Sequence, residues 1–336
     1  MAYPEPLPLG TSIFPPQTLA GSVAFVTGGG TGLGKAMATE IARCGAAIAV
    51  ASRKPEHLAA GVAAIQALGA RAMAVAVDVR DPDAIAAAFD AVEAELGPVD
   101  VLVNNAAGNF PQPAEDMSPK GWRAVTDIVL DGTFFCSTEF ARRRIAAGLP
   151  GSILNIAATY SWTGGPGTAH SAAAKAGVVN LTQSLAVEWA PHGIRVNGIA
   201  PGLFPHDDMP AHMRQRPETA DDRDRTVPAG RVGRLQELGW AAAFLCSPFA
   251  SYISGHTLVV DGANWLRRGL RMPEFVSVRD QFGSSASGSD GVASVLPGED
   301  PARAASQPTG SDVVASVLPG DDPARAAGKQ GGASDA

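Results

Sequence analysis

The sequence predicts an α/β fold: a doubly wound, parallel sheet of seven strands in a single domain, followed by a disordered C-terminal tail. Between residues 22 and 262, short apolar runs alternate with segments long enough to form helices. The runs are apolar at nearly every position, as strands covered by helices on both faces must be. A glycine-rich segment, residues 27–34, follows the first run and opens a helical pattern, which is typical of Rossmann-type sheets.

Seven apolar runs are the expected strands. They are Val23–Thr27, Ala47–Ser52, Ala72–Val79, Val99–Asn104, Ser152–Ala157, Arg195–Ala200 and Thr257–Val260. The segments between them are the expected helices, and two of these carry start signals. Asp81-Pro82 and Ser118-Pro119 each place a side chain that accepts hydrogen bonds just before a first-turn proline.

Composition shifts set the expected boundaries. We expect an N-terminal extension at residues 1–18, a single α/β domain at 19–270 and a C-terminal extension at 271–336. Within the domain, residues 203–230 are polar and contain four prolines, and their place after the sixth strand predicts a substrate lid.

The C-terminal tail is rich in Gly, Ala, Ser and Pro from about Ser284 onward. It contains a near-duplicate of 16 residues, at Asp290–Ala305 and Asp312–Ala327. Two copies of a polar unit cannot bury a core, so we expect this tail to be disordered. A pair of docking motifs is the alternative.

Composition narrows the class of protein. The net charge of −7 and the pI of about 5.4 argue against a general affinity for nucleic acid or anionic membranes. Cys44, Cys136 and Cys246 lack metal-type spacing and are expected to be buried, reduced thiols. No apolar run is long enough to span a bilayer, and the N-terminus does not resemble a signal peptide. We therefore expect a cytoplasmic protein.

The glycine-rich segment predicts a dinucleotide site. Glycines let the backbone approach a pyrophosphate, whose charge then lies at the N-terminus of the following helix. The expected contacts are Gly28, Gly30, Thr31, Gly32, Leu33 and Gly34. Further contacts are expected where later strands end, at Asp78, Val79, Asn105, Ala106, Pro201 and Gly202.

The residues after the second strand indicate which cofactor binds. A site that prefers NAD usually has a carboxylate here for the ribose hydroxyls, and Ser52-Arg53-Lys54 has none. Arg53 and Lys54 can instead neutralise a 2′-phosphate, which favours NADPH. The alternative is that both are solvent-exposed cations.

These features resemble the short-chain dehydrogenase/reductase family over about residues 19–266. Members usually carry Tyr-x-x-x-Lys with a catalytic serine upstream. Here Ser171 stands in the tyrosine position ahead of Lys175, Ala158 stands in the serine position, and the nearest upstream tyrosine is Tyr160. The usual triad for ketone reduction is therefore broken.

The displaced tyrosine is similar to that of the mitochondrial-type 2,4-dienoyl-CoA reductases. Three further stretches share this resemblance: Gly28–Lys35, Asn105–Phe110 and Asp127–Leu130. The resemblance implies reduction of 2,4-dienoyl-CoA to enoyl-CoA in the β-oxidation of unsaturated fatty acids, with NADPH as cofactor. It also implies a homotetramer.

The resemblance further implies roles for individual residues. Tyr160 and Asn109 would donate hydrogen bonds to the thioester oxygen as an enolate develops, in the manner of an oxyanion hole. Lys175 would bind the nicotinamide ribose, and Ser171, one helical turn away, would face the cofactor with it. Arg80, Phe110 and Ser118, together with Tyr160, would contact the acyl-CoA; as surface or core residues they can also be purely structural.

Departures from the family pattern concern the proton relay and the lid. Asp131 replaces the usual asparagine and cannot donate a hydrogen bond when ionised. No threonine follows Pro201-Gly202 closely enough to bond the carboxamide. The lid carries His206, Asp207, Asp208 and His212, which we interpret as a solvated loop rather than a metal site.

Two alternatives to a 2,4-dienoyl-CoA reductase stay open. The protein can be another acyl-CoA, enoyl or carbonyl reductase of the same family, or a non-catalytic NADP-binding protein.

Overall fold

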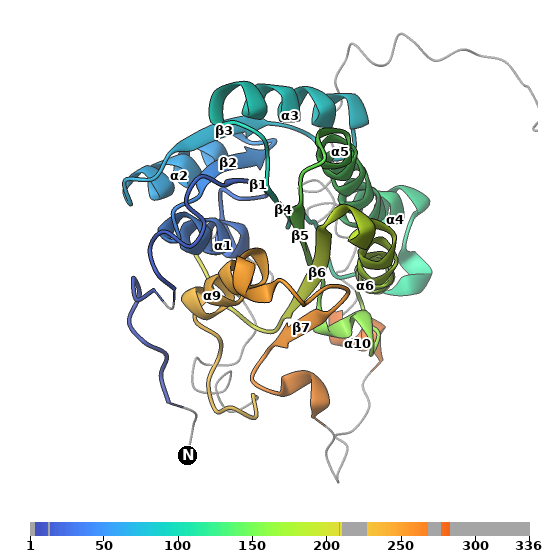
Figure 1. Cartoon of the computed structure of the whole chain (residues 1–336). Helices are drawn as coiled ribbons and strands as arrows, with labels where there is room; N and C mark the ends of the chain where they lie inside the picture. The colour runs from blue at the N-terminus through green and yellow to red at the C-terminus, as the bar shows by residue number, and fades with distance from the viewer. Residues whose placement is uncertain (1–3, 13, 208, 210–226, 268–276, 283–336) are drawn as a thin grey trace, which may run out of the picture. The chain divides into compact units, whose positions relative to one another are not determined.

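A computed structural model describes residues 4–12, 14–207, 209, 227–267 and 277–282, all within one compact unit spanning Met1–Leu296. Its centre is a sheet of seven parallel strands in the order β3-β2-β1-β4-β5-β6-β7 (Figure 1). The strands are β1 (Val23–Thr27), β2 (Ala47–Ser52), β3 (Ala72–Ala76), β4 (Val101–Asn104), β5 (Gly151–Ile156), β6 (Ile194–Pro201) and β7 (Thr257–Val260). The predicted doubly wound fold is confirmed.

Three strands have the predicted bounds, and the other four differ by one to three residues at an end. β3 ends at Ala76 rather than Val79, and just beyond it the side chain of Asp78 is bonded by Arg80. β4 begins later than predicted because Asp100 turns its carboxylate to the backbone N–H of Val23, at 2.9 Å. The contact of Asp100 with Val23 joins residues far apart in the chain, so the local pattern does not contain it.

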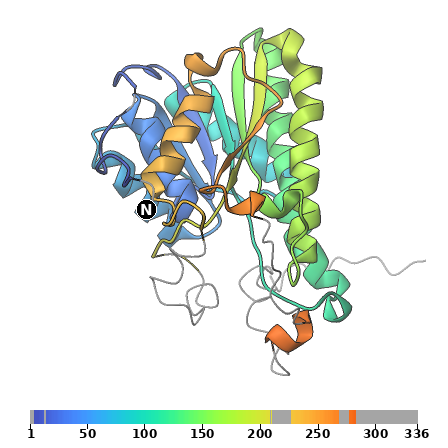
Figure 2. The same cartoon turned by 90° about the horizontal axis from the view of Figure 1, so that it is seen from below.

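Helices cover both faces of the sheet (Figures 1 and 2). One apolar layer joins the sheet to α1 (Gly32–Arg43), α2 (Pro55–Gln66) and α9 (Leu235–Cys246). The other joins it to α3 (Pro82–Leu96), α4 (Pro119–Thr126), α5 (Gly132–Ala147) and α6 (Ala169–Trp189). Cys44, Cys136 and Cys246 are buried in these layers as free thiols, as expected.

Both predicted helix starts are confirmed. The carboxylate of Asp81 accepts hydrogen bonds from the N–H groups of Asp83 and Ala84, at 3.0 and 3.1 Å, and so caps α3. The hydroxyl of Ser118 accepts from the N–H of Gly121 at 3.0 Å and caps α4. A π-helix, η2 (Asp127–Asp131), follows α4 and leads into α5.

The N-terminal segment packs along α9 (Figure 1). The ring of Phe14 stacks on those of Phe244 and Phe249, with centroids 6.4 and 5.4 Å away. Glu5 pairs with Arg234 at 3.1 Å. We call residues 4–16 the N-terminal strap.

Parts of the predicted extensions and lid lie outside the described residues. These parts are residues 1–3 and 13 of the N-terminal extension, residues 208 and 210–226 of the lid, with Asp208 and His212 among them, and residues 271–276 and 283–336 of the C-terminal extension. Within the expected irregular region 271–336, Val278–Phe282 forms a short helix, α10, and Arg279 pairs with Glu115 at 2.9 Å and Asp116 at 3.0 Å. Among the described helices, none is both long and apolar enough to cross a membrane.

Candidate cofactor and active site

A cavity of about 470 Å³ opens at the carboxyl ends of the strands. It lies beside β1 and β4, where the strand order reverses and successive crossovers diverge to leave a crevice. Its lining includes the predicted residues Gly28, Thr31, Gly32, Leu33, Gly34, Arg53, Lys54, Asp78, Val79, Asn105, Ala106 and Asn109. The structure therefore gathers most of the predicted cofactor residues around one cavity.

The glycine-rich loop is fixed to the end of β4. Gly28 has a φ of +63°, which a side chain would strain, and a Cβ on Gly34 would come within 2.1 Å of the Gly28 carbonyl oxygen. The hydroxyl of Thr27 accepts hydrogen bonds from the N–H groups of Asn105 and Ala106 at 2.9 and 3.0 Å. The Asn105 amide in turn donates to the Gly28 carbonyl at 3.2 Å. Asn105 thus holds the loop in position.

Four predicted cofactor residues, Gly30, Lys175, Pro201 and Gly202, are not among those that line the cavity. A Cβ on Gly30 would lie 2.0 Å from the carbonyl oxygen of His57, so this glycine lets α2 pack on the loop. A Cβ on Gly202 would lie 2.5 Å from the Cβ of Asp261. At both positions the absence of a side chain therefore lets another segment of the chain, at His57 or at Asp261, pack closely against the backbone.

Charges in the cavity are mainly positive. Arg53 and Lys54 follow β2 and line the cavity, as does His57 of α2. The carboxylate of Asp78 is held by Arg80, whose Nε donates to it at 2.9 Å, while Arg53 lies 3.7 Å away. Burial alone would raise the pKa of Asp78, but the bonds from Arg80 outweigh it and lower the pKa below its usual range. Arg80 is therefore engaged by Asp78.

Tyr160 is joined to Ser171 across two elements. Tyr160 lies in the short helix η3 (Thr159–Ser161) and Ser171 in the first turn of α6, and their side-chain oxygens are 3.0 Å apart. Burial raises the pKa of Tyr160, and the bond to Ser171 lowers it by less. The phenol therefore stays protonated near neutral pH and can act as a donor.

Lys175 lies one turn after Ser171 and is buried. Its ammonium group donates a hydrogen bond to the backbone carbonyl of Ile156, the last residue of β5. Burial lowers its pKa from 10.5 to about 8. A lysine of this kind carries a charge near neutral pH and loses it in mildly alkaline solution.

Asn109 and Phe110 follow β4, and their side chains lie in different surroundings, the first at the cavity and the second in the core. Asn109 lines the cavity, and its Oδ1 is buried with no hydrogen-bond partner among the described residues. The ring of Phe110 is buried and meets the ring of His170 edge-on, with centroids 4.6 Å apart. Phe110 is therefore a core residue between the loop after β4 and α6.

The remaining predicted residues have structural partners. The hydroxyl of Ser118 is used in capping α4, although the side chain is at the surface. Asp131 ends the π-helix, and burial, followed by the nearby Asp127, raises its pKa. The described residues hold no group of three side chains arranged to bind a metal ion.

Two histidines near the site have no role in the sequence-based hypothesis. His170 is fully buried, and neither ring nitrogen has a hydrogen-bond partner in the described part of the chain. His206, which the sequence suggested only as part of a solvated loop, lines the cofactor cavity. The order of residues gives no signal for either contact, because each depends on segments far away in the chain.

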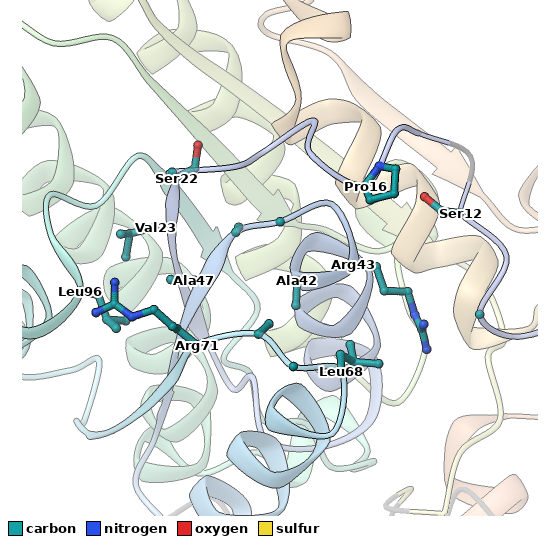
Figure 3. A pocket seen from close by; sticks show the side chains of 16 residues that line it. Ser12, Pro16, Ser22, Val23, Ala42, Arg43, Ala47, Leu68, Arg71 and Leu96 are labelled. Atoms are coloured by element: carbon teal, nitrogen blue, oxygen red, sulfur yellow. The ribbon is translucent and has the colours of Figure 1, made fainter.

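Another cavity, of about 590 Å³, lies at the opposite edge of the sheet (Figure 3). Ser22, Val23 and Ala47 line it where β1 and β2 begin, together with Arg43 and Arg71. None of the predicted site residues lines it, and it lies away from the carboxyl ends of the strands. We assign it no part in the chemistry.

Comparisons with known proteins place this geometry in a family. Residues 28–263 match the family model described as enoyl-(acyl carrier protein) reductase. The chain is 44% identical over 243 residues to a probable 2,4-dienoyl-CoA reductase [(2E)-enoyl-CoA-producing] of Bacillus subtilis, covering 72% of this chain and 96% of the relative. It is 38% identical over 274 residues to the peroxisomal 2,4-dienoyl-CoA reductase [(3E)-enoyl-CoA-producing] of Arabidopsis thaliana, covering 78% and 91%.

A solved structure agrees with the fold. The gluconate 5-dehydrogenase of Burkholderia cenocepacia, in complex with NADP and tartrate, superposes with a TM-score of 0.70 at 35% identity, covering 75% of this chain and 99% of that one. The family match, the relatives and the glycine-rich loop beneath the cavity all agree. The chain belongs to the short-chain dehydrogenase/reductase family of oxidoreductases.

Proposed function

We propose that this chain is an NADPH-dependent 2,4-dienoyl-CoA reductase that acts in the β-oxidation of unsaturated fatty acids. The hydrogen bond between Tyr160 and Ser171 carries the proposal. It joins the displaced tyrosine to the residue that occupies the usual tyrosine position, one turn before Lys175. Relatives from Bacillus and Arabidopsis are named for this reaction, which supports the assignment.

The cavity fits a nicotinamide dinucleotide. The glycine-rich loop leaves room for phosphate at the N-terminus of α1, and Arg53 and Lys54 provide cations for a 2′-phosphate. The carboxylate of Asp78 is already neutralised by Arg80 and so repels a phosphate little. NADP bound to the gluconate 5-dehydrogenase structure supports the same preference. When bound, NADPH supplies the hydride for reduction.

The protein's own residues stabilise the charge that develops on the substrate. As the diene is reduced at its far end, negative charge spreads to the thioester oxygen, and a proton delivered by water to the α-carbon then neutralises the enolate. Tyr160, kept protonated by burial, donates a hydrogen bond to that oxygen, and the Asn109 amide is the second donor. Lys175 adds positive potential and holds the nicotinamide ribose. For Arg80, Phe110 and Ser118, the bond to Asp78, the packing on His170 and the cap of α4 favour structural roles over acyl-CoA contacts.

Reduction of a simple carbonyl is the second candidate, since a gluconate 5-dehydrogenase is among the similar structures. Ser171 in the tyrosine position and Ala158 in the serine position argue against it. A non-catalytic NADP-binding protein is the third.

A substrate panel distinguishes these candidates. The purified full chain is mixed with NADPH and a 2,4-dienoyl-CoA, a 2-enoyl-CoA or a 5-keto sugar acid, and oxidation of NADPH is followed by absorbance. We expect the 2,4-dienoyl-CoA to have the highest kcat/KM. Faster reduction of the keto acid would reject the proposal, and tight NADPH binding without turnover of any thioester would favour the non-catalytic protein.

A further inference from the structure

His206 lies against the glycine-rich loop. A Cβ built on Gly32 would meet the imidazole at 2.7 Å from Cε1, 3.0 Å from Nε2 and 3.1 Å from Nδ1. Gly32 is the first residue of α1 and has a φ of +48°. The missing side chain at Gly32 therefore makes room for an imidazole that comes from the segment after β6.

Buried neighbours hold this segment in place. Phe204 is 4% exposed and packs on Gly233, where a Cβ would lie 2.3 Å from the ring. The N–H of Gly233 donates to the carbonyl of Leu203 at 3.0 Å, and the N–H of the buried Met209 donates to the carbonyl of His206 at 3.1 Å. His206 thus lies between two anchored residues.

Charges around His206 suit an anion. Arg53, Lys54 and His57 line the same cavity from β2 and α2. The first turn of α1 contains no acidic residue, and its N-terminal N–H groups carry partial positive charge. Of the acidic groups that the structure describes here, Asp78 is paired with Arg80, and Asp207, which has contacts of its own, is exposed.

We propose that His206 is a cofactor-binding residue whose protonated imidazole holds the diphosphate of NADP(H) at the N-terminus of α1, so that cofactor affinity depends on pH. The proposal rests on the cofactor part of the proposed function and does not depend on the thioester substrate. It replaces the expectation of a solvated loop at position 206 with a defined contact to the phosphate loop.

The direction of the pH dependence follows from linkage. An imidazolium that gains an anionic partner has a higher pKa in the complex than in the free protein. Its contribution to binding is complete below the free pKa and is lost as pH rises through the pKa of the complex. Affinity should therefore fall from acidic to alkaline pH. His57, the other imidazole in the cavity, is the matched control.

The experiment measures dissociation constants by calorimetry for NAD⁺ and NADP⁺ with the full chain between about pH 5.5 and 8.5, where histidine titrates. The NAD⁺ diphosphate keeps its charge over this range, so NAD⁺ isolates the protein's titration from that of a 2′-phosphate. We expect wild-type affinity for NAD⁺ to fall about tenfold across the range, as one charge-assisted hydrogen bond implies. In His206→Gln the fall below about pH 7.5 should vanish, because the part that remains nearer pH 8 belongs to Lys175, whereas His57→Gln should retain it.

Two further readouts make the result specific. His206→Gln should weaken NAD⁺ and NADP⁺ by the same factor at low pH, whereas Arg53→Ala should weaken NADP⁺ alone. In proton NMR, the His206 resonance, identified by its loss in His206→Gln, should titrate at higher pH when NAD⁺ is added. Unchanged or tighter binding by a folded His206→Gln variant, or an unchanged titration, would overturn the proposal. Failure to reduce any thioester would reject the proposed function and leave these binding results standing.

Discussion

At the scale of single residues, the site depends on two buried groups whose protonation states are displaced in opposite directions. Burial favours the neutral form of both Tyr160 and Lys175, raising the pKa of the phenol and lowering that of the ammonium. The phenol therefore stays a hydrogen-bond donor through neutral pH, while the lysine charge is lost around pH 8. The protonated phenol of Tyr160 and the positive charge of Lys175 are therefore present together only below about pH 8.

We predict that Tyr160→Phe lowers kcat for a 2,4-dienoyl-CoA about 100-fold, with a smaller change in KM. The substitution keeps the ring and removes one donor whose bond strengthens as the enolate forms. Steady-state kinetics with NADPH check this, and Asn109→Ala should behave similarly.

Ser171→Ala is the matched comparison for the tyrosine, because it removes the other partner of the same hydrogen bond. We expect a milder loss, since Ser171 then orients Tyr160 rather than contacting substrate. The reverse order, with Ser171→Ala inactive and Tyr160→Phe active, would show that Ser171 has taken over the role of the usual family tyrosine.

We predict that Lys175 makes the unliganded protein more stable as pH rises from 8 to 10.5. Its folded pKa of about 8 lies below the ordinary 10.5, so the unfolded chain binds more protons between these values. The free energy of unfolding therefore rises with pH in this window and is unaffected by this group below it. Relative to Lys175→Met, the wild type should gain about 3 kcal/mol across the window. Denaturant unfolding of both proteins tests this, and parallel curves would contradict the buried-lysine assignment.

At the scale of elements, helix starts and strand ends place the site residues. The loop after β1 leads into α1, the π-helix η2 leads into α5, and Tyr160 lies in the short helix η3 after β5. Each of these lies at the carboxyl edge of the sheet, where parallel strands deliver side chains to a common crevice. Side-chain caps at Asp81 and Ser118 mark the starts of α3 and α4.

We predict that Ser118→Ala lowers the free energy of unfolding by about 1 kcal/mol, as loss of a helix cap does, without raising KM for the thioester. The hydroxyl accepts from the Gly121 N–H, which leaves it little capacity for a ligand. Asp81→Ala removes the equivalent cap of α3 and is the control for a purely structural loss. A rise in KM for Ser118→Ala alone would restore Ser118 as a CoA contact.

The sequence predicted correctly those features that depend on residues close together in the chain. The bounds of β1, β2 and β7, both caps and the glycine-rich loop follow from residues a few positions apart. The sequence could not reveal that Gly30 lies against the backbone of His57, nor that His206 reaches Gly32. Those contacts arise only when distant segments pack together, and they matter most at the cavity because several strand ends converge there.

At the scale of the molecule, the described part of the fold and of the candidate site lies within residues 4–282, and the described apolar layers on the two faces of the sheet are built from residues between Phe14 and Val260. We therefore predict that a chain ending at Gly283 keeps its turnover and its Tm. Thermal unfolding and kinetics of both lengths check this. A chain starting at Leu19 is the contrasting control, because it loses the Phe14 stacking and should unfold at lower temperature. A loss of Tm or activity in the shorter C-terminal variant would show that the repeats dock on the domain.

The N-terminal strap also sets an order of events during synthesis. Glu5 and Phe14 emerge from the ribosome long before their partners, Arg234 at the N-cap of α9 and Phe244 within it. Contacts so distant in sequence form late, because the loop between them must first be closed. The nascent chain therefore carries the strap undocked while most of the sheet is assembled, and its docking marks the completion of the α9 layer.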